Sequence, residues 1–551
     1  MPVTGAAETP SGGFVHPVVE RVLVVLLLAF LAANALVVAR ADTPTVDEFV
    51  YLPAGYYHLQ TGDLTFDTTN PPFLKMAMAV PLLAMDLTFD RDPRWRDNST
   101  GWAPWIFGTH FMRANPARYL DAFFAGRLVT IAFALATGLV LWWWTRTALT
   151  PTAALAALFL WCVQPTVIAH GAIATLDMGL TALVFGGFFA LARFSATELR
   201  PWAALAGVLF GLGIAGKGTT LIFLPLVPVL VVVGWGGWDR ERLLKLADGM
   251  VVLAVSAWVA LLAAYRFSGF PLPEPMLEMI RFQANASSAG EYPAFLNGQW
   301  SQTGWWYYFL EAFALKTPIA TLVLVLVGSA AVARRRTRGD LWFVLPPLLL
   351  LYVLSFHYGK NYGVRYLLPA LPFLFVIAGL GAELLLRDRR VTVGLAGLLL
   401  WQLGSTMLHA PQHLAYFNEL AGGSDHHRRL LLDSNLDWGQ DLGRLQHYLE
   451  ANGTNQVALA YFGHVDPKLY GLEYTLPPAA PAAGRYVVSA NFLAGYPYAL
   501  TYTPGRMVGV RRGQWSWLDR LPPKTRVGSS LLVFDVSDDD VRRLETGPQA
   551  R

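Results

Sequence analysis

The sequence predicts a mainly α-helical polytopic membrane protein with a small α/β domain near its C-terminal end. Three observations lead to this fold class. Hydrophobic residues make up 54% of the 551 residues and charged residues only 15%, whereas soluble domains carry about 25% charged residues. The mean hydropathy is +0.40, and the apolar residues gather in blocks long enough to cross a bilayer. Most of the chain is therefore expected to lie in lipid.

The apolar blocks define a predicted transmembrane domain over residues 16–409. A span of the ~30 Å hydrocarbon layer takes about 20 helical residues, and about eleven blocks approach this length. They run over 22–39, 123–145, 152–169, 178–192, 202–216, 219–234, 249–266, 309–332, 341–356, 364–386 and 391–408. Arg21 and the small residues near Ala39 also suit a secretory signal, but a run of about 18 apolar residues exceeds the usual 7 to 15. An uncleaved first helix is the favoured interpretation.

The loops between the blocks predict the orientation of the chain. Alternate loops carry Arg or Lys residues: Arg146; Arg193 and Arg200; Arg240, Arg242 and Lys245; Arg334, Arg335, Arg336 and Arg338; Arg387, Arg389 and Arg390. Loops rich in Lys and Arg stay in the cytoplasm. The N-terminus is therefore expected inside, and the first external loop (40–122), the second (267–308) and everything after about 409 are expected outside.

The two ends of the chain differ in character from the apolar middle. Residues 1–15 and 546–551 are small and polar, which predicts a disordered cytoplasmic N-terminus and a short tail. Residues 410–545 predict an extracytoplasmic α/β domain, with a helix over 436–450 and strands over 457–462, 485–492 and 530–536. The lone Cys162 leaves no disulfide within the chain. Within the first external loop, the apolar run Phe73 to Ala84 is too short to span and predicts an interfacial helix.

Ionisable residues at the ends of the apolar blocks fall mostly on the predicted outer side. A charge at membrane depth costs about 2.5–3.5 kcal/mol on insertion scales, so such residues are functional candidates. They are Asp47, Glu48, His170, Asp177, Lys217, His357, Lys360 and Arg365. The cytoplasmic side carries only the Arg and Lys clusters that set the orientation. A site at the outer face is therefore predicted, with carboxylates in one part and cations in another.

The adjacent acids Asp47 and Glu48 suit a general base, because a carboxylate at a low-dielectric boundary holds a proton more readily. Helix capping by Thr45 or Asp47 is the alternative. Asp47, Glu48 and Asp177 are also candidate ligands for a hard divalent cation.

An ordered series of motifs resembles a known family. Asp47-Glu48-Phe-Val-Tyr51 is followed by Gly62-Asp63 and by Pro71-Pro72, then by Ala174-Thr175-Leu176-Asp177, by Gly211-Leu-Gly-Ile-Ala-Gly-Lys217-Gly218 and by Arg365-Tyr366-Leu-Leu-Pro369. Each motif alone is weak, but the order over residues 40 to 375 is fairly specific. The series resembles the protein O-mannosyltransferase and aminoarabinose transferase group, which are integral membrane glycosyltransferases of the C-type fold (glycosyltransferase family 39-like).

The resemblance implies a reaction and roles for the candidate residues. Such enzymes pass a sugar from a polyprenyl phosphate to an acceptor hydroxyl, usually with inversion. Asp47 would be the base, and Glu48 and Asp177 would orient the reactants. The cations Lys217, Lys360 and Arg365 would bind the donor phosphate, and Tyr51, Asn70 and His357 would contact substrate. No cofactor is required, although a divalent cation remains a candidate. Asn70 departs from the family, where a charged residue or His often precedes Pro-Pro.

A second motif lies in the predicted outer domain, at residues 432–441. Asp433, Asp437 and Asp441 recur every four residues, which would place them on one face of a helix. Capping of this helix by Ser434 or Asn435 is favoured over metal binding.

The leading hypothesis is a membrane glycosyltransferase in a bacterial plasma membrane, acting at the outer face. Its partners would be a polyprenyl-phosphate-linked sugar, an acceptor protein, glycan or lipid, and the bilayer, with no nucleic acid. The alternatives are a lipid-linked-sugar transporter or flippase, which would need a polar site near mid-membrane, and a non-catalytic assembly subunit.

Overall fold

A computed structural model of the chain describes residues 16–67, 69–91, 103–234, 239–287, 293–357, 361–502 and 507–546. The N-terminal residues 1–15, Lys360 and the tail after Thr546 lie outside the described residues. The predictions made for them stay predictions.

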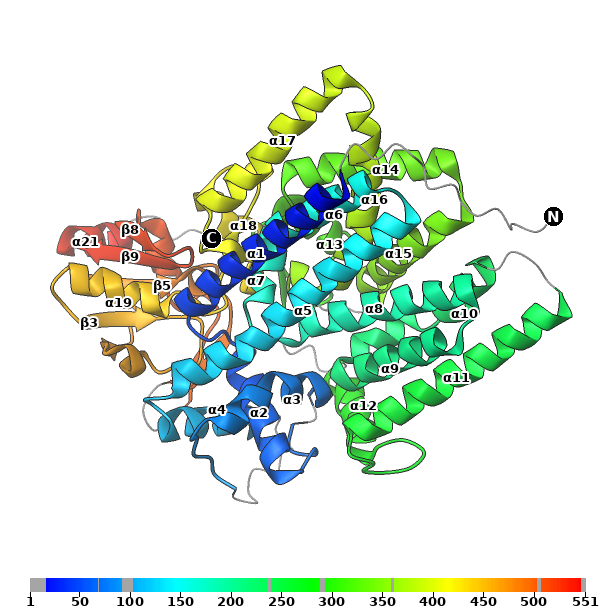
Figure 1. The fold of residues 1–551 in the computed structure, drawn as a ribbon. Coiled ribbons are helices and arrows are strands. Elements are labelled where there is room, and N and C mark those ends of the chain that lie inside the picture. Colours follow the sequence, from blue (N-terminus) through cyan, green and yellow to red (C-terminus); the bar gives the residue numbers. More distant parts are fainter. Residues whose placement is uncertain are drawn as a thin grey trace.

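Helices dominate the structure, and each predicted apolar block falls on a helical segment (Figure 1). The helices of the membrane domain are α1 (Pro17–Ala41), α5 (Tyr119–Ala148), α6 (Pro151–Val163), α7 (Pro165–Gly171), α8 (Leu176–Thr197), α9 (Arg200–Gly216), α10 (Leu226–Gly234), α11 (Arg240–Ala264), α13 (Tyr308–Lys316), α14 (Ile319–Arg335), α15 (Leu341–Phe356), α16 (Leu371–Leu386) and α17 (Arg389–Leu408). The predicted fold class, a mainly helical membrane protein with a small sheet region, is confirmed.

Seven helical segments among the described residues are long and apolar enough to cross a membrane, or eight if the bent pair α6–α7 forms one span. They are α1, α5, α8, α11, α15 with the turn before it, α16 with the preceding 3-10 helix η5 (Val364–Ala370), and α17. The predicted blocks at 202–216, 219–234 and 309–332 fall on shorter or interrupted helices. The chain is an integral membrane protein.

Two features of the helical bundle follow directly from the sequence. The chain bends by 61° between α6 and α7, where Pro165 begins a new helix and cannot continue the old one. Helices α9 and α11 approach closely at Gly207 and Gly211. A Cβ at either glycine would lie 2.2 Å from a backbone oxygen of α11, so no larger residue fits this crossing.

The described part of residues 40–122, predicted to be the first external loop, folds into a compact unit at one end of the bundle (blue in Figure 1). It contains α2 (Glu48–Thr61), α3 (Phe73–Ala79), the 3-10 helix η1 (Val80–Ala84) and α4 (Ala103–Ala114). The helix predicted over 73–84 is present as α3 and η1, and its position at the membrane interface stays a prediction. Its inner face is buried against α2, α5 and α9, through Leu74, Met78 and Leu82. Lys75 on the same helix forms a buried ion pair with Asp67, at 2.8 Å.

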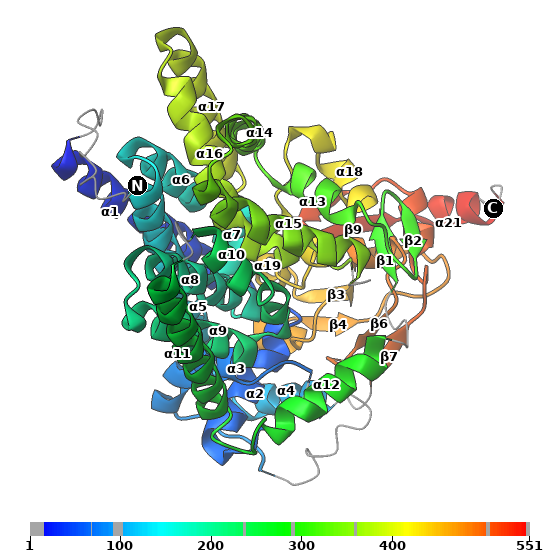
Figure 2. The same cartoon turned by 90° about the vertical axis from the view of Figure 1, so that its right-hand side faces the viewer.

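The segment predicted to be the second external loop carries α12 (Glu274–Ser287) and the hairpin of β1 (Ala294–Leu296) with β2 (Gln299–Ser301). Figure 2 shows α12 crossing below the C-terminal strands.

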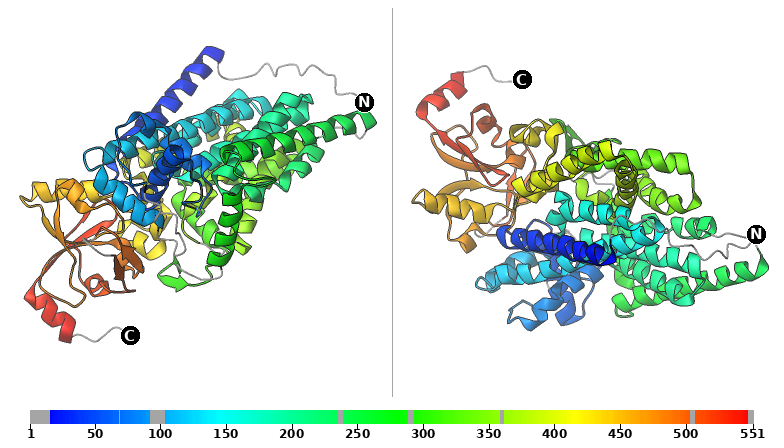
Figure 3. Two further views of the ribbon diagram at one scale, coloured as in Figure 1. Left: turned by 90° about the horizontal axis from the view of Figure 1, so that it is seen from below. Right: turned by 45° about the horizontal axis from the view of Figure 1, so that its top comes forward.

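The C-terminal region is built on a five-stranded sheet of order β4-β3-β5-β9-β8. Its strands are β3 (Gln456–Ala460), β4 (Glu473–Thr475), β5 (Gly484–Ser489), β8 (Thr525–Val527) and β9 (Leu531–Val536), and β6 (Tyr498–Leu500) pairs with β7 (Val508–Val510) in a separate hairpin. Strand β3 is parallel to β4 and β5, and β9 is antiparallel to β5 and β8. The three predicted strands are confirmed as β3, β5 and β9. Figure 3 shows this region, with α19 (Leu442–Ala451) and α21 (Asp538–Thr546), at one end of the helical bundle.

The predicted helix over 436–450 is wrong in its first half. Residues 433–435 form one 3-10 turn, η8, and α19 begins only at Leu442. Between them the chain turns at Gly439, whose φ of 88° favours glycine. A Cβ there would lie 2.6 Å from the carbonyl oxygen of Phe462. Asp433, Asp437 and Asp441 therefore do not share a helix face.

Candidate active site

Four charged residues from distant parts of the sequence meet in one ion-pair network. Asp47 contacts Arg365 at 2.6 Å between Oδ2 and Nη1. The same Nη1 lies 3.6 Å from Oδ2 of Asp177, and the other oxygen of Asp177 accepts a hydrogen bond from Lys217 at 2.5 Å. Two carboxylates thus alternate with two cations. Four of the residues predicted for the site are brought together.

Asp47 is the most accessible member of the network. It stands between α1 and α2, where Pro44 interrupts the helical run, and its side chain makes no capping hydrogen bond to α2. Capping by Asp47, the alternative considered from the sequence, is therefore wrong. Its side chain is 18% exposed, against 2% for Asp177. Of these two acids, only Asp47 is open to a reactant.

Asp177 and Lys217 are held by the ends of two neighbouring helices. Asp177 lies in the first turn of α8, where the helix dipole favours a negative charge. Lys217 follows the last residue of α9 in an extended conformation. Gly216 before it packs against Leu74 of α3, since a Cβ would lie 2.7 Å from that side chain. Gly216 therefore lets α3 sit directly on the end of α9.

Arg365 lies at the start of η5, just after Gly363. Gly363 has a φ of 138°, and a Cβ there would lie 2.2 Å from Oγ of Ser434. The guanidinium lies against two aromatic rings, 4.4 Å from the ring centre of Trp438 and 5.2 Å from that of Tyr366. The negative faces of aromatic rings attract a cation, so these contacts stabilise the charge of Arg365. Lys217 lies 5.0 Å from the same Tyr366 ring.

Glu48 occupies a separate, buried position behind the network. Its carboxylate receives both Nε and Nη2 of Arg127, each at 2.7 Å. It also accepts hydrogen bonds from the backbone of Thr45 at 2.8 Å and of Ala174 at 2.7 Å, and it is fully buried. Because Thr45 precedes Asp47 and Ala174 precedes Asp177, this carboxylate joins the two segments that carry the acids of the network. The geometry suits a positioning residue and leaves no oxygen for substrate.

Arg127 also braces the linker after α1. Its Nη1 donates to the carbonyl oxygens of Ala39 and Asp42, each at 2.7 Å, and Nη2 donates to Thr43 at 3.2 Å. Sequence reasoning missed this arginine. A single charged residue near the start of the apolar block 123–145 was the signal that could have identified it.

Tyr51 and Asn70 are joined by a hydrogen bond of 3.1 Å from the Asn70 amide to the Tyr51 hydroxyl. The carbonyl oxygen of Asn70 in turn accepts from Lys75 at 2.8 Å. Burial and the charge of Asp47 hold the pKa of Tyr51 well above its usual value, so its hydroxyl stays protonated. Asn70 thus has a hydrogen-bonding role within the first loop, and its contact with substrate stays a prediction.

The remaining predicted residues are not part of the network. His357 follows the end of α15 and is exposed, with its ring 5.2 Å from that of Tyr352. Lys360 lies outside the described residues. Within the described ranges, no group of three or more His, Cys, Asp or Glu side chains is arranged to hold a metal ion. Asp177 and Glu48 are committed to cations instead.

The 432–441 segment covers the network from the C-terminal side. The backbone amides of Thr43 and Val46 donate to the carbonyl oxygens of Gln440 and Trp438, at 2.9 and 3.1 Å. This pairing ties the segment to the linker that carries Asp47. The indole of Trp438 lies over Arg365. The ring centre of His170 lies 6.1 Å from that of Trp438.

Two of the three acids in this segment have structural roles. Asp437 accepts hydrogen bonds from the Ser489 hydroxyl and, at 3.1 Å, from the Gly439 amide. Asp441 accepts from the backbone amides of Ser529 and Ser530, at 2.8 and 2.9 Å. The predicted capping by Ser434 or Asn435 is wrong, because α19 begins after Asp441 without a side-chain cap.

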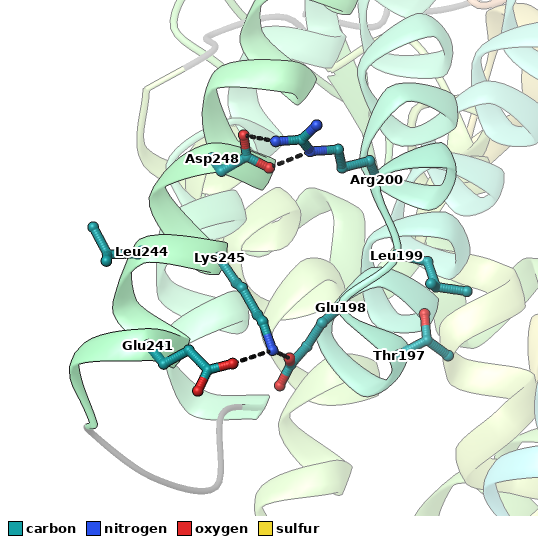
Figure 4. A pocket seen from close by; sticks show the side chains of 8 residues that line it. All are labelled: Thr197, Glu198, Leu199, Arg200, Glu241, Leu244, Lys245 and Asp248. Carbon is teal, nitrogen blue, oxygen red and sulfur yellow. Dashed lines mark hydrogen bonds and ion pairs between the residues drawn. The ribbon is translucent and has the colours of Figure 1, made fainter.

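One surface pocket lies at the opposite end of α8 (Figure 4). It is formed by the α8–α9 turn and the start of α11, and its charged side chains are already paired. Lys245 contacts Glu198 at 3.3 Å and Glu241 at 2.9 Å, and Arg200 contacts Asp248 at 2.6 Å. Since α8 has 22 residues, about 30 Å separates this pocket from Asp177. It is therefore not part of the candidate active site.

Residues 119–261 match the model of the family described as dolichyl-phosphate-mannose-protein mannosyltransferase. This stretch contains Asp177 and Lys217 with their motifs, so the predicted resemblance is confirmed there. The motifs around Asp47 and Arg365 lie outside it. No curated protein matches the chain.

Several solved structures are similar to the chain at low identity. ArnT from Cupriavidus metallidurans in the apo state is 18% identical over 70% of this chain and 63% of its own, with a TM-score of 0.45. The chain thus spans less than two thirds of that protein. The same enzyme bound to undecaprenyl phosphate is 14% identical, over 96% and 99%, with a TM-score of 0.44. The Pmt1-Pmt2 O-mannosyltransferase complex of S. cerevisiae, bound to the sugar donor, is 16% identical over 45% and 33%, with a TM-score of 0.33.

Proposed function

We propose that the protein is a membrane glycosyltransferase that moves a sugar from a polyprenyl phosphate to an acceptor hydroxyl. The observation that carries the proposal is the network of Asp47, Arg365, Asp177 and Lys217, in which one partly exposed carboxylate faces cations suited to phosphate. The match of residues 119–261 to the dolichyl-phosphate-mannose-protein mannosyltransferase family supports it.

The network supplies the two functions that such a transfer needs. As the acceptor oxygen attacks the anomeric carbon, Asp47 takes its proton. The bond from that carbon to the phosphate oxygen breaks, and the polyprenyl phosphate leaves with one more negative charge than the donor phosphodiester had. Arg365 and Lys217 stabilise this added charge. Attack from the side opposite the phosphate gives inversion. Asp177 fixes the two cations in place.

The pairing of Asp47 with Arg365 couples donor binding to activation of the base. In the structure Arg365 is engaged by the carboxylate at 2.6 Å, and the two carboxylates of the network balance its two cations. A donor phosphate competes with Asp47 for Arg365, because both are anions that accept from the same guanidinium. Donor binding thereby releases Asp47 toward the acceptor. Asp47 is therefore free to act as the base when the donor is bound.

We place the site at the outer face of a bacterial plasma membrane, with the N-terminus in the cytoplasm. Arg200 and Lys245 lie beside the C-terminal end of α8 (Figure 4), whereas Asp177 lies in the first turn of the same helix. Loops rich in Arg and Lys remain cytoplasmic. The acceptor, whether protein Ser or Thr, a glycan or a lipid, then reaches Asp47 from the outside.

Cysteine labelling in intact cells tests this orientation. The native Cys162 is buried, so it gives little background. Ala451→Cys, at the exposed end of α19, is expected to react with a membrane-impermeant maleimide. Arg338→Cys, in the exposed 3-10 turn after α14, is expected to react only after lysis. The reverse pattern would contradict the proposed orientation.

The activity itself is tested with purified protein in liposomes. A panel of labelled polyprenyl-phosphate hexoses and pentoses is offered with peptide, glycan and lipid acceptors. At least one donor is expected to be consumed, with free polyprenyl phosphate and a glycosylated acceptor as products. If the protein moves a donor across the bilayer without cleaving it, a transporter is the better assignment.

Arg365→Gln is expected to weaken donor binding about 10- to 100-fold, since a hydrogen bond to a charged group contributes about 1.5–3 kcal/mol. Binding of undecaprenyl phosphate to the purified protein measures this effect. Arg336→Gln is the matched control, because Arg336 is exposed at the other end of the bundle. Unchanged affinity in Arg365→Gln would remove this residue from the phosphate site.

A further inference from the structure

Asp433 is held in an unusual backbone conformation beside the network. Its φ is 57°, a left-handed conformation that Asp and Asn adopt more readily than most residues. The carboxylate accepts from the Ser434 amide at 2.6 Å and from the Tyr496 hydroxyl at 3.2 Å. The backbone amide of Asp433 donates to Asn491 at 3.1 Å. Strained residues that their surroundings fix in this way cluster at functional sites.

The residues after Asp433 anchor it to the segment that carries Arg365. The hydroxyl of Ser434 donates to the carbonyl oxygen of Tyr362 at 2.6 Å. The side-chain oxygen of Asn435 accepts from the amide of Val364, the residue just before Arg365, at 2.9 Å. The position of this carboxylate is therefore fixed relative to the guanidinium.

The charges of both Asp47 and Arg365 act on the pKa of Asp433. Burial raises the pKa of its carboxyl to about 6, the charge of Arg365 lowers it, and that of Asp47 raises it again. Its side chain is nevertheless partly exposed, whereas Asp437 and Asp441 are 1% exposed. Of the three acids in the 432–441 segment, Asp433 is the one that a substrate can reach.

We propose that Asp433 is a substrate-binding residue that accepts hydrogen bonds from hydroxyls of the transferred sugar, so that the C-terminal 432–441 segment completes the active site. The inference rests on the proposed function and extends it. In the donor complex the sugar links the phosphate at Arg365 to the acceptor oxygen at Asp47. The 432–441 segment is hydrogen-bonded both to Val364, next to Arg365, and to the linker that carries Asp47, which places its partly exposed carboxylate beside the sugar. A carboxylate there repels phosphate but suits neutral hydroxyls.

Asp433→Asn tests the proposal, because Asn tolerates the left-handed conformation and keeps one acceptor oxygen. Transfer and binding are measured with a sugar-bearing donor, and binding is measured in parallel with bare undecaprenyl phosphate. We expect kcat/KM for transfer to fall about 10- to 100-fold, as for loss of a charge-assisted hydrogen bond. Affinity for the bare lipid phosphate is expected to stay unchanged or to rise, because a negative charge near Arg365 is removed.

The pH profile gives a second readout that a merely structural role would not move. Protonation of Asp433 removes the charge that strengthens its bonds to the sugar. The kcat/KM of the wild type is therefore expected to fall as the pH drops through about 6, and this fall is expected to be reduced in Asp433→Asn. Asp437→Asn is the matched control, since it neutralises a buried acid of the same segment and is expected to keep the wild-type fall of kcat/KM at low pH.

The outcomes separate this inference from the proposed function. If Asp433→Asn transfers like the wild type while Asp47→Asn is inactive, the function stands and the role of Asp433 is wrong. Equal weakening of the sugar-bearing and bare lipids, together with a lower unfolding temperature, would also overturn that role in favour of a structural one. If the wild type transfers no sugar from any donor, both fail.

Discussion

Asp47→Asn is expected to lower the transfer rate about 1,000-fold, within the range of about 100- to 10,000-fold that a positioned general base contributes. The amide cannot accept the proton of the acceptor hydroxyl. The same substitution frees Arg365 from its 2.6 Å ion pair, so donor binding is expected to be unchanged or tighter. Steady-state transfer and equilibrium binding of undecaprenyl phosphate, measured on one preparation, check both halves of this prediction.

The control for this variant is Asp86→Asn, which neutralises an exposed acid elsewhere in residues 40–122. It is expected to behave like the wild type in both measurements. A loss of transfer in Asp47→Asn that is matched by an equal loss of donor binding would show that Asp47 holds the site together instead of accepting a proton.

Arg127→Met is expected to give the largest loss of stability. It leaves the carboxylate of Glu48 buried without its cation and removes the donors to Ala39, Asp42 and Thr43. Breaking one partner of a buried ion pair costs about 3–5 kcal/mol. The measurement is the apparent unfolding temperature of the purified protein in detergent, together with the yield of folded protein.

The matched control breaks an exposed ion pair in the same way. Arg200 and Asp248 lie 2.6 Å apart, but their side chains are 69% and 39% exposed, and such pairs contribute little. Arg200→Met is expected to unfold at the wild-type temperature. If Arg127→Met is as stable as this control, Glu48 and Arg127 do not brace the site, and the positioning role given to Glu48 is wrong.

The membrane helices and the grouping of the charged residues followed from the sequence because both depend on one-dimensional patterns. Apolar blocks set the spans, and alternation of the loops brings Asp47, Asp177, Lys217 and Arg365 to one side. Neither pattern distinguishes Asp47 from Glu48. Neighbours on a helix point about 100° apart, so one acid faces Arg365 and the other turns inward to Arg127. Only the packing of α2 against α5 decides which acid is accessible.

The 432–441 segment shows why spacing misled. Acids at every fourth residue suggested a helix face, but the segment is fixed by long-range hydrogen bonds to residues 43 and 46 and by the turn at Gly439. Sequence spacing carries no information on such partners. Trp438 could likewise not be placed over Arg365 from the sequence, because 73 positions separate them.

The most direct test of the account combines binding and transfer in the same liposomes for the wild type, Asp47→Asn and Arg365→Gln. Each protein is first loaded with a labelled polyprenyl-phosphate sugar, and an acceptor is then added for a single turnover. We predict that Asp47→Asn retains the donor but does not transfer its sugar, and that Arg365→Gln retains little donor. Transfer by Asp47→Asn at the wild-type rate would contradict the assignment of Asp47 as the base.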